Sequence, residues 1–129
     1  MKFCYILRLI ENKYYVGITS NIEKRMNQHF SGQGAKWTKI YKPLEIIEIE
    51  PFTHKWQESY TTLITMKKYG IENVRGGPWC QINLIIYPKI TLIDETKSIE
   101  ENYLIYKGFI SSLTIDFSKI VLINKDNQK

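Results

Sequence analysis

The sequence has no apolar run of the roughly 20 residues that a membrane-spanning helix needs, and it has only two cysteines among its 129 residues. The missing run excludes the usual helical membrane protein. Cys4 lies in an apolar run and Cys80 follows a tryptophan, so neither resembles a metal-ligand pair, and we expect two buried thiols in a reducing compartment. The first residues enter a strand pattern directly and do not resemble a signal peptide. These absences favour an intracellular protein, in the cytoplasm or the nucleus.

The composition is that of a globular chain with a basic surplus. Hydrophobic residues make up 43% and aromatic residues 13%, which places the chain far from the disordered class. Eighteen Lys and Arg against thirteen Asp and Glu give a formal net charge of +5, which favours association with polyanions such as nucleic acid. Charge kept for solubility explains the surplus equally well, so charge alone does not decide.

The hydrophobic pattern predicts an α+β fold. Two β-branched and aromatic runs separated by a polar turn indicate a hairpin, and a third run, after Pro43, alternates apolar and acidic residues as a half-exposed strand does. Ser20 or Asn21 can cap one helix and Thr53 another. The predicted order is strand, strand, helix, strand and helix, over residues 3–10, 14–19, 22–30, 44–50 and 53–69. We therefore expect a small, central, mainly antiparallel three-stranded sheet flanked by helices.

The pattern divides the chain into a domain of residues 1–83 and a C-terminal extension of residues 84–129. The extension is too short for an independent domain, so we expect it to pack on the first domain or to dock on a partner. Residues 82–93 are mostly apolar, with an interruption at Pro88. Three further segments are predicted to be irregular, helical and extended, respectively: residues 71–78, 95–106 and 115–123.

The first predicted helix presents two rows of side chains at a spacing of four. Ile22, Met26 and Phe30 form the row that we expect to be buried. Arg25 and His29 form a second row, one residue behind, on a flank of the buried face. An Arg holds a phosphate through its planar fork, and a His binds phosphate or transfers a proton. An exposed pair on a solvated helix has the same spacing, so these two residues indicate a site only in combination with others.

Two tyrosines and one acid complete the set of chemical candidates. Tyr5 and Tyr15 lie on the two strands of the hairpin, but parity across a turn does not decide whether they share a face, and two core tyrosines give the same pattern. Gly17 would let a backbone or a phosphate approach closely. Glu58 lies near the start of the second helix, where the helix dipole favours an acid. A single carboxylate there could also hold Mg²⁺ largely through water.

In combination, these residues resemble the GIY-YIG nuclease domain. The resemblance covers roughly residues 2–83 and rests on motifs in a fixed order: Phe3-Cys4-Tyr5, Tyr15-Val16-Gly17, Arg25 ten residues past Tyr15, then His29 and Glu58. The first motif departs from Gly-Ile-Tyr but keeps its tyrosine, and the second is a common variant. Two downstream runs resemble a subgroup of the family: Gly32 to Thr38 (GQGAKWT) and Lys68 to Gly77 (KYGIENVRGG).

The resemblance implies an endonuclease that hydrolyses phosphodiester bonds with one divalent ion. Glu58 would hold Mg²⁺ or Mn²⁺, and the ion would polarise the scissile phosphate. Tyr5 or Tyr15 would help to deprotonate the attacking water. Arg25 would stabilise charge on the phosphoryl oxygens, and His29 would contact phosphate or relay a proton. Many members carry a lysine three residues after the tyrosine of the second motif; this chain has isoleucine there, which leaves more of the task to the arginine and the histidine.

DNA is the expected partner, bound through residues near the same face. Trp37 would stack on a base or brace its loop, and Asn73 is a candidate for an asparagine that organises the site. No element that reads bases is evident, so we expect recognition through the DNA backbone or shape. The candidate nucleic-acid-binding residues are Lys36, Trp37, Lys39, Lys42, Asn73 and Arg75.

Two other functions are compatible with the sequence. The first is a DNA-binding module that keeps the fold without the activity, against which the intact set of five residues argues. The second is an accessory subunit of a nucleic-acid-processing complex that docks on a protein partner through residues 82–93. Exposure of that stretch would favour docking, and packing of the stretch on the domain would argue against it.

Overall fold

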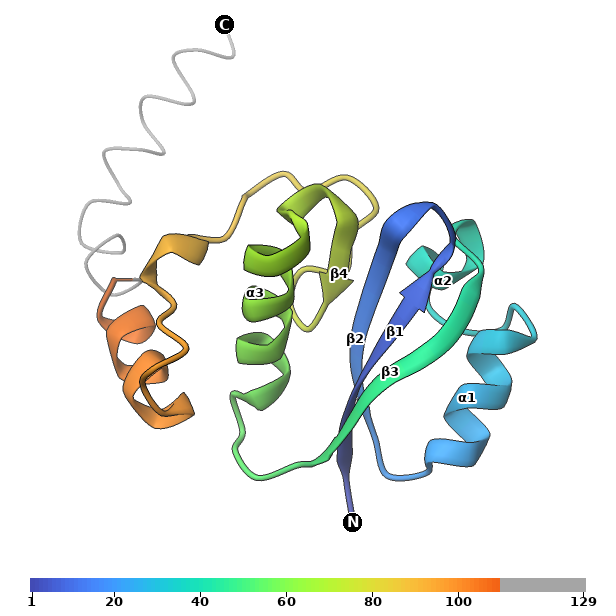
Figure 1. Cartoon of the computed structure of the whole chain (residues 1–129), viewed down its shortest axis with the longest axis horizontal. Coiled ribbons are helices and arrows are strands. Elements are labelled where there is room, and N and C mark those ends of the chain that lie inside the picture. Colours follow the sequence, from blue (N-terminus) through green and yellow to red (C-terminus); the bar gives the residue numbers. More distant parts are fainter. Residues whose placement is uncertain (110–129) are drawn as a thin grey trace, which may run out of the picture.

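The protein is built around one mixed sheet with the strand order β3-β1-β2-β4 (Figure 1). The computed structural model describes residues 1–109. β1 (Phe3–Leu9) pairs antiparallel with β2 (Lys13–Thr19) and with β3 (Pro43–Pro51), whereas β4 (Val74–Gly76) pairs parallel with β2. The predicted α+β class is confirmed. The predicted three-stranded, mainly antiparallel sheet is wrong in one respect, because it omits β4.

Helices cover both faces of this sheet. α1 (Ile22–Phe30) and α2 (Lys36–Ile40) pack on one face, and α3 (Gln57–Tyr69) packs on the other (Figure 1). A further helix over residues 99–109 lies outside α3. The strand predicted for residues 115–123 lies outside the described residues. Within the described residues, no helix is both long and apolar enough to cross a membrane.

Strand alternation sorts the core into two layers. Successive side chains of a strand point to opposite faces, so Tyr5 and Leu7 of β1 pack toward α1 and α2, whereas Cys4 and Ile6 pack toward α3. The layer under α1 and α2 contains Tyr5, Leu7, Leu9, Met26 and Trp37. The layer under α3 contains Cys4, Ile6, Tyr14, Val16, Met66 and Val74. The hairpin tyrosines at positions 5 and 15 therefore share a face, which sequence parity left open.

The two principal helices begin in different ways. α1 begins at the predicted cap, since the side chain of Asn21 accepts a hydrogen bond of 3.0 Å from the Lys24 N–H. α3 begins four residues later than predicted, and Thr53 does not cap it. Instead, the side chain of Gln57 accepts from the Thr53 N–H at 2.6 Å and donates to the Pro51 carbonyl at 2.9 Å. This side chain links the end of β3 to the first turn of α3.

The buried side of α1 differs from the predicted row. Met26 is buried and Ile22 is half-buried, but Phe30 is 41% exposed and His29 is completely buried. An α-helix has about 3.6 residues per turn, so two turns take about seven residues. His29, seven residues after Ile22, therefore lies closer to the face of Ile22 than Phe30 does, eight residues after it. The rotation carries His29 into the core and Phe30 toward solvent.

The glycine-rich segment of residues 71–78 was predicted to be irregular. This prediction was wrong, because the segment contains β4. Gly76 lies within this strand, and a Cβ there would stand 2.5 Å from the Val16 carbonyl oxygen of the neighbouring strand. Glycine is therefore required by the close approach of two backbones and does not mark a loop. α2 is also absent from the predicted elements.

The apolar stretch of residues 82–93 divides into two halves. Ile93 is buried against Leu63 of α3 and against Tyr106 of the last helix. Ile85 and Ile86, by contrast, are 83% and 79% exposed. Ile93 therefore packs on the domain, whereas Ile85 and Ile86 form an exposed apolar loop after the partly buried Leu84.

Candidate active site

Two tyrosines and a glycine form the floor of the site on the face under α1. Tyr5 pairs with Gly17 across the hairpin, and Tyr15 lies two pairs further along, with its ring centroid 6.3 Å from that of Tyr5. A Cβ on Gly17 would stand 2.4 Å from the Tyr5 hydroxyl oxygen. The glycine thus leaves the space that the Tyr5 ring occupies, and its role is packing at the site.

His29 of α1 lies against both tyrosine rings. The Tyr5 hydroxyl and the His29 Nε2 atom are 2.7 Å apart, and the other ring nitrogen, Nδ1, is 3.1 Å from the Thr38 hydroxyl oxygen. The His29 ring centroid lies 5.7 Å from that of Tyr5 and 5.1 Å from that of Tyr15. Because His29 is fully buried, its two ring nitrogens depend on these protein partners and not on water.

Arg25 brings a positive charge to this buried cluster. Burial and, secondarily, the Arg25 charge lower the pKa of His29 from 6.5 to about 4. Burial, aided by Tyr15, raises the pKa of Tyr5, and burial also raises the pKa of Tyr15; the Arg25 guanidinium opposes both increases. At neutral pH both phenols and the imidazole are therefore uncharged, and Arg25 is the cation beside them.

Glu58 supplies the acidic group, from the second position of α3. Burial raises the pKa of its carboxyl, which the backbone N–H of Gly77 opposes by donating a hydrogen bond to it. Its charge contributes to the raised pKa values of both Tyr5 and Tyr15. The fold therefore brings together all five predicted catalytic residues, drawn from β1, β2, α1 and α3.

Glu58 is the acidic group that the site offers to a metal ion. No group of three His, Cys, Asp or Glu side chains within residues 1–109 is placed to hold a metal. Mg²⁺ keeps several waters and often takes only one or two protein carboxylates together with phosphate oxygens. The half-buried Glu58 carboxylate is compatible with that type of binding, and not with a site in which protein side chains surround the ion.

The predicted nucleic-acid-binding residues fall into two groups. Lys36, Lys39 and Lys42 are exposed on α2 and just after it. Lys39 and Lys42 also line a hollow of about 230 Å³ whose wall includes His29 and Thr38. These three lysines are therefore accessible to a phosphate backbone that approaches from the α2 side.

Trp37 and Arg75 are placed differently from that prediction, because both are buried. The Arg75 guanidinium lies 4.5 Å from the Trp37 ring and donates to four backbone carbonyls, those of Ile71, Val74, Gln81 and Ile82. The Trp37 indole donates to the Tyr14 carbonyl at 3.0 Å. Of the two roles expected of Trp37, bracing fits its position and base stacking does not.

Asn73 lies at the other end of the sheet. It accepts a hydrogen bond of 2.8 Å from Lys13 and donates to the Tyr69 carbonyl at 2.7 Å. Lys13 is four residues before Gly17 on β2, which is about 13 Å along a strand. Asn73 therefore joins the hairpin to the end of α3 and does not contact the tyrosine cluster.

Two details of the site were not visible in the sequence. Thr38 contacts His29 directly, yet a threonine in a short helix carries no signal for such a role. Cys80, predicted to be buried like Cys4, is exposed, and its thiol contributes to the raised pKa of Tyr15. The prediction for Cys80 was wrong because the chain after β4 turns out toward the rim of the site.

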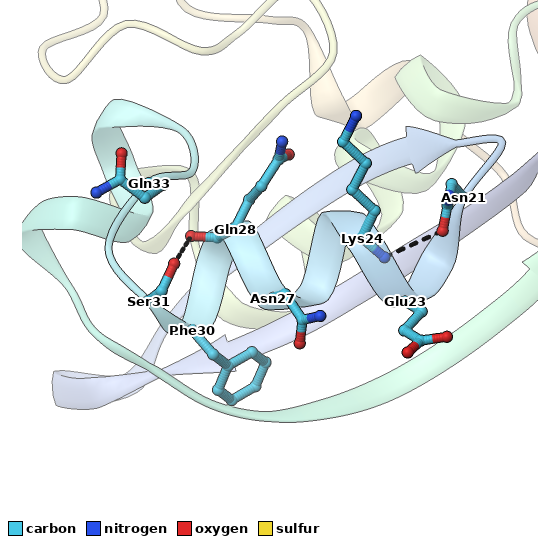
Figure 2. Close-up of a pocket in the computed structure, with 8 residues that line it drawn as sticks. All are labelled: Asn21, Glu23, Lys24, Asn27, Gln28, Phe30, Ser31 and Gln33. Carbon is cyan, nitrogen blue, oxygen red and sulfur yellow. Dashed lines mark hydrogen bonds between the residues drawn. The ribbon is translucent and has the colours of Figure 1, made fainter.

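A hollow on the surface of α1 lies away from the residues of this site. It has a volume of about 780 Å³ and follows the outer side of α1, where Asn21, Lys24, Gln28 and Ser31 lie along the helix (Figure 2). Its lining is polar or exposed and contains none of the five clustered residues. We therefore assign the site by its titratable groups and not by the size of the cavity.

A histidine-bonded tyrosine on a hairpin, with an arginine on the next helix and a carboxylate at the rim, is the arrangement expected of a GIY-YIG nuclease domain. The family model for the GIY-YIG catalytic domain matches residues 1–62. Together with the relatives below, this match shows that the chain belongs to the GIY-YIG family. This is a family of nucleases that generally use divalent metals and act on nucleic acid.

The relatives are named UPF0213 proteins. The chain is 37% identical over 70 residues to UPF0213 protein YazA of Bacillus subtilis, covering 51% of this chain and 71% of that protein. It is 31% identical over 103 residues to UPF0213 protein CPE1444 of Clostridium perfringens, covering 80% of this chain and 94% of that protein. No solved structure matches the chain.

Proposed function

We propose that this chain is a metal-dependent endonuclease that hydrolyses DNA phosphodiester bonds with a single divalent ion. The observation that supports the proposal is the buried contact of 2.7 Å between the Tyr5 hydroxyl and His29 Nε2. Through this contact, Tyr5, which could accept a proton from water, is hydrogen-bonded to a second base, His29. The positive charge of Arg25 lies beside both residues. Membership of a nuclease family supports the same reaction class.

The proton of the attacking water would move through Tyr5 to His29. As the water oxygen forms its bond to phosphorus, its proton passes to the Tyr5 oxygen, and the phenolic proton passes to Nε2 of His29. Because the pKa of Tyr5 is raised, a free phenolate is unfavourable there, and the paired transfer avoids it. The bond from phosphorus to the leaving oxygen breaks in the same displacement.

Arg25 would couple substrate binding to the strength of this base. Its charge is one cause of the low pKa of His29. A phosphate held by the Arg25 guanidinium would offset that charge, so the pKa of His29 would rise when substrate is present. The same guanidinium would stabilise the negative charge that develops on the phosphoryl oxygens.

Glu58 would hold the divalent ion, Mg²⁺ or Mn²⁺, at the rim of the site. When bound, the ion polarises the scissile phosphate and stabilises the leaving oxygen. Glu58 is half-buried at the start of α3, and its charge acts on both tyrosines of the cluster. DNA would be held at its backbone by Lys36, Lys39 and Lys42, without base readout.

The test is nicking of supercoiled plasmid in the presence of Mg²⁺ or Mn²⁺. Glu58→Ala and Arg25→Ala are each expected to reduce the cleavage rate by roughly 100-fold or more, as the loss of one preorganised charge does in other enzymes. Glu23→Ala and Arg8→Ala are matched controls, because Glu23 is exposed on α1 and Arg8 forms an exposed ion pair with Glu45. Equal cleavage by all five proteins would contradict the assignment.

A second candidate function, docking on a protein partner, is favoured by one observation. Ile85 and Ile86 are among the most exposed apolar side chains of residues 1–109, and exposed apolar groups that lie together often mark an interaction site. DNA binding without cleavage across several metals, together with capture of a partner that Ile85→Ser/Ile86→Ser loses, would favour an accessory subunit over the enzyme.

A further inference from the structure

Thr38 makes two hydrogen bonds that fix how it meets His29. Its hydroxyl oxygen lies 2.9 Å from the Ala35 carbonyl oxygen, three residues earlier, and 3.1 Å from Nδ1 of His29. A threonine hydroxyl has one proton to donate. A carbonyl oxygen only accepts, so that proton goes to Ala35. The Thr38 oxygen is then left as an acceptor toward the imidazole.

Tyr5 imposes the same arrangement from the other side of the ring. Its side chain is buried, and its hydroxyl lies 2.7 Å from His29 Nε2 and also bonds the Arg25 guanidinium. The neighbouring Arg25 is a donor only. The Tyr5 proton is therefore satisfied only if Nε2 accepts it. No buried polar side-chain atom of the described residues lacks a partner, which agrees with this assignment.

We infer that Thr38 is a positioning residue that holds His29 in the Nδ1–H tautomer, so that Nε2 is the acceptor facing Tyr5. The catalytic consequence of this inference rests on the proposed function; the tautomer itself does not. With the opposite tautomer, Nε2 would carry a proton and could not take one from Tyr5. Proton transfer from Tyr5 to His29 would then be blocked.

The loop before α2 seals this contact. A Cβ on Gly34 would stand 2.3 Å from Nδ1 of His29 and 2.9 Å from the Thr38 hydroxyl oxygen. The Gly34 backbone thus lies directly against the two polar atoms, and both side chains are buried. The Thr38 oxygen is therefore the acceptor for a proton on Nδ1, and this arrangement agrees with the one that Tyr5 favours at Nε2.

The first readout is the ¹⁵N NMR spectrum of the imidazole in the full chain. His29 and His54 are the only histidines, so His54→Gln identifies the His29 signals. We expect a pyrrole-type shift at Nδ1 and a pyridine-type shift at Nε2 in the native protein and in Thr38→Ser, which keeps the hydroxyl. Thr38→Val keeps the shape without the acceptor, and we expect its two nitrogens to give averaged shifts.

The second readout is cleavage. Thr38→Val is expected to lower kcat about 10- to 100-fold, the size seen when a partner that orients a catalytic or metal-bound histidine is lost, with KM for DNA within about twofold. Thr38→Ser is expected to restore most of kcat. Circular dichroism shows whether each variant is folded, and Thr38→Ser reports on the hydroxyl if the valine variant is not.

Each result has one meaning. A native protein with its proton on Nε2, or a Thr38→Val variant that keeps the native tautomer, overturns the inference. A Thr38→Val variant with native kcat overturns the positioning role. If the native chain cleaves no nucleic acid while the predicted shifts are present, the proposed function fails and the tautomer assignment stands.

Discussion

His29 is a histidine whose charge the fold suppresses. It is completely buried, its partners are neutral hydroxyl groups, and the charge of the Arg25 guanidinium lowers its pKa further. Each of these features favours the neutral ring. A base that is already deprotonated at neutral pH can accept a proton without first losing one, which is the state that the proposed relay requires.

The suppressed charge makes stability depend on pH. The pKa of His29 is about 4 in the folded protein against an ordinary value of 6.5, so between these values the unfolded chain binds a proton that the folded chain does not. The free energy of unfolding is therefore expected to fall as the pH drops from about 6.5 to about 4, and this contribution levels off below that window. Urea unfolding at several pH values measures it.

His29→Gln is the control for this pH dependence. Both proteins share every carboxylate and His54, so the difference between their unfolding free energies isolates the titration of His29. The difference is expected to change across the window and to be constant above it. A difference that does not vary with pH would show that the folded and unfolded states protonate this position equally.

The order of the motifs, through the family resemblance, predicted which residues form the site but not where each of them lies. Tyr5, Tyr15 and Glu58 were predicted as parts of one set, and the register of the hairpin and the start of α3 then brought them together. Arg75 and Trp37 were predicted to contact DNA because arginine and tryptophan do so on surfaces. Sequence cannot distinguish such residues from a buried guanidinium stacked on an indole, since burial depends on distant segments.

At the scale of secondary structure, the long periodic elements were predictable and the short ones were not. β1, β2 and β3 carry strong patterns of their own and match the predicted strands within one residue at either end. β4 has only three residues, and it exists because it pairs with β2 and because Arg75 ties it to the following loop. α2 has five residues and depends on Trp37 being buried. Tertiary contacts define both elements, so local sequence carries little signal for them.

The hairpin leads to a prediction at Gly17. Gly17→Ala would place a methyl group 2.4 Å from the Tyr5 hydroxyl oxygen, so the Tyr5 ring must shift and its contact with His29 would be disturbed. We expect the free energy of unfolding to fall by about 1–3 kcal/mol. We also expect the cleavage rate of the folded protein to fall, because Tyr5 is displaced. Gly108→Ala is the matched control, because a Cβ there meets nothing within 4 Å and alanine favours a helix. Native activity in Gly17→Ala would contradict the packing of this site.

Arg75 leads to a second prediction at this scale. Arg75→Lys keeps the charge but loses the planar fork that binds carbonyls on both sides of β4. Several buried carbonyls would lose their donor, at about 1–3 kcal/mol each where no water replaces it. We expect a clear decrease in the urea midpoint. Arg8→Lys, at an exposed ion pair with Glu45, is expected to change stability by less than about 1 kcal/mol.

At the scale of the whole molecule, residues 93–106 pack in part against the outer side of α3. Trp56 and Tyr60, at the start of this helix, pack with Leu63, Ile93 and Tyr106 in one apolar cluster. His54, just before α3, bonds Glu100 of the last helix at 2.7 Å. These contacts join residues 93, 100 and 106 to the first half of α3 and to the segment just before it. The exposed loop at Ile85 and Ile86 is the part that they leave uncovered.

The basic surplus yields the prediction that concerns the whole surface. If Lys36, Lys39 and Lys42 neutralise phosphates, replacing all three by alanine lowers the slope of log Kd against log salt concentration by up to about 2.7, since each duplex phosphate contact contributes about 0.9. Fluorescence anisotropy with a labelled duplex and no divalent ion measures this slope. The affinity at low salt is expected to fall with it.

A second triple variant separates position from total charge. Lys55, Lys97 and Lys107 are exposed before α3 and in the C-terminal part, and replacing them by alanine also removes three positive charges from the formal +5. Non-specific attraction by net charge would change the slope equally in both variants. Binding at the face of α2 that adjoins His29 would change it only in the first. Equal slopes would therefore show that the basic residues attract DNA through net charge alone. Lys36, Lys39 and Lys42 would then no longer be assigned as specific DNA contacts.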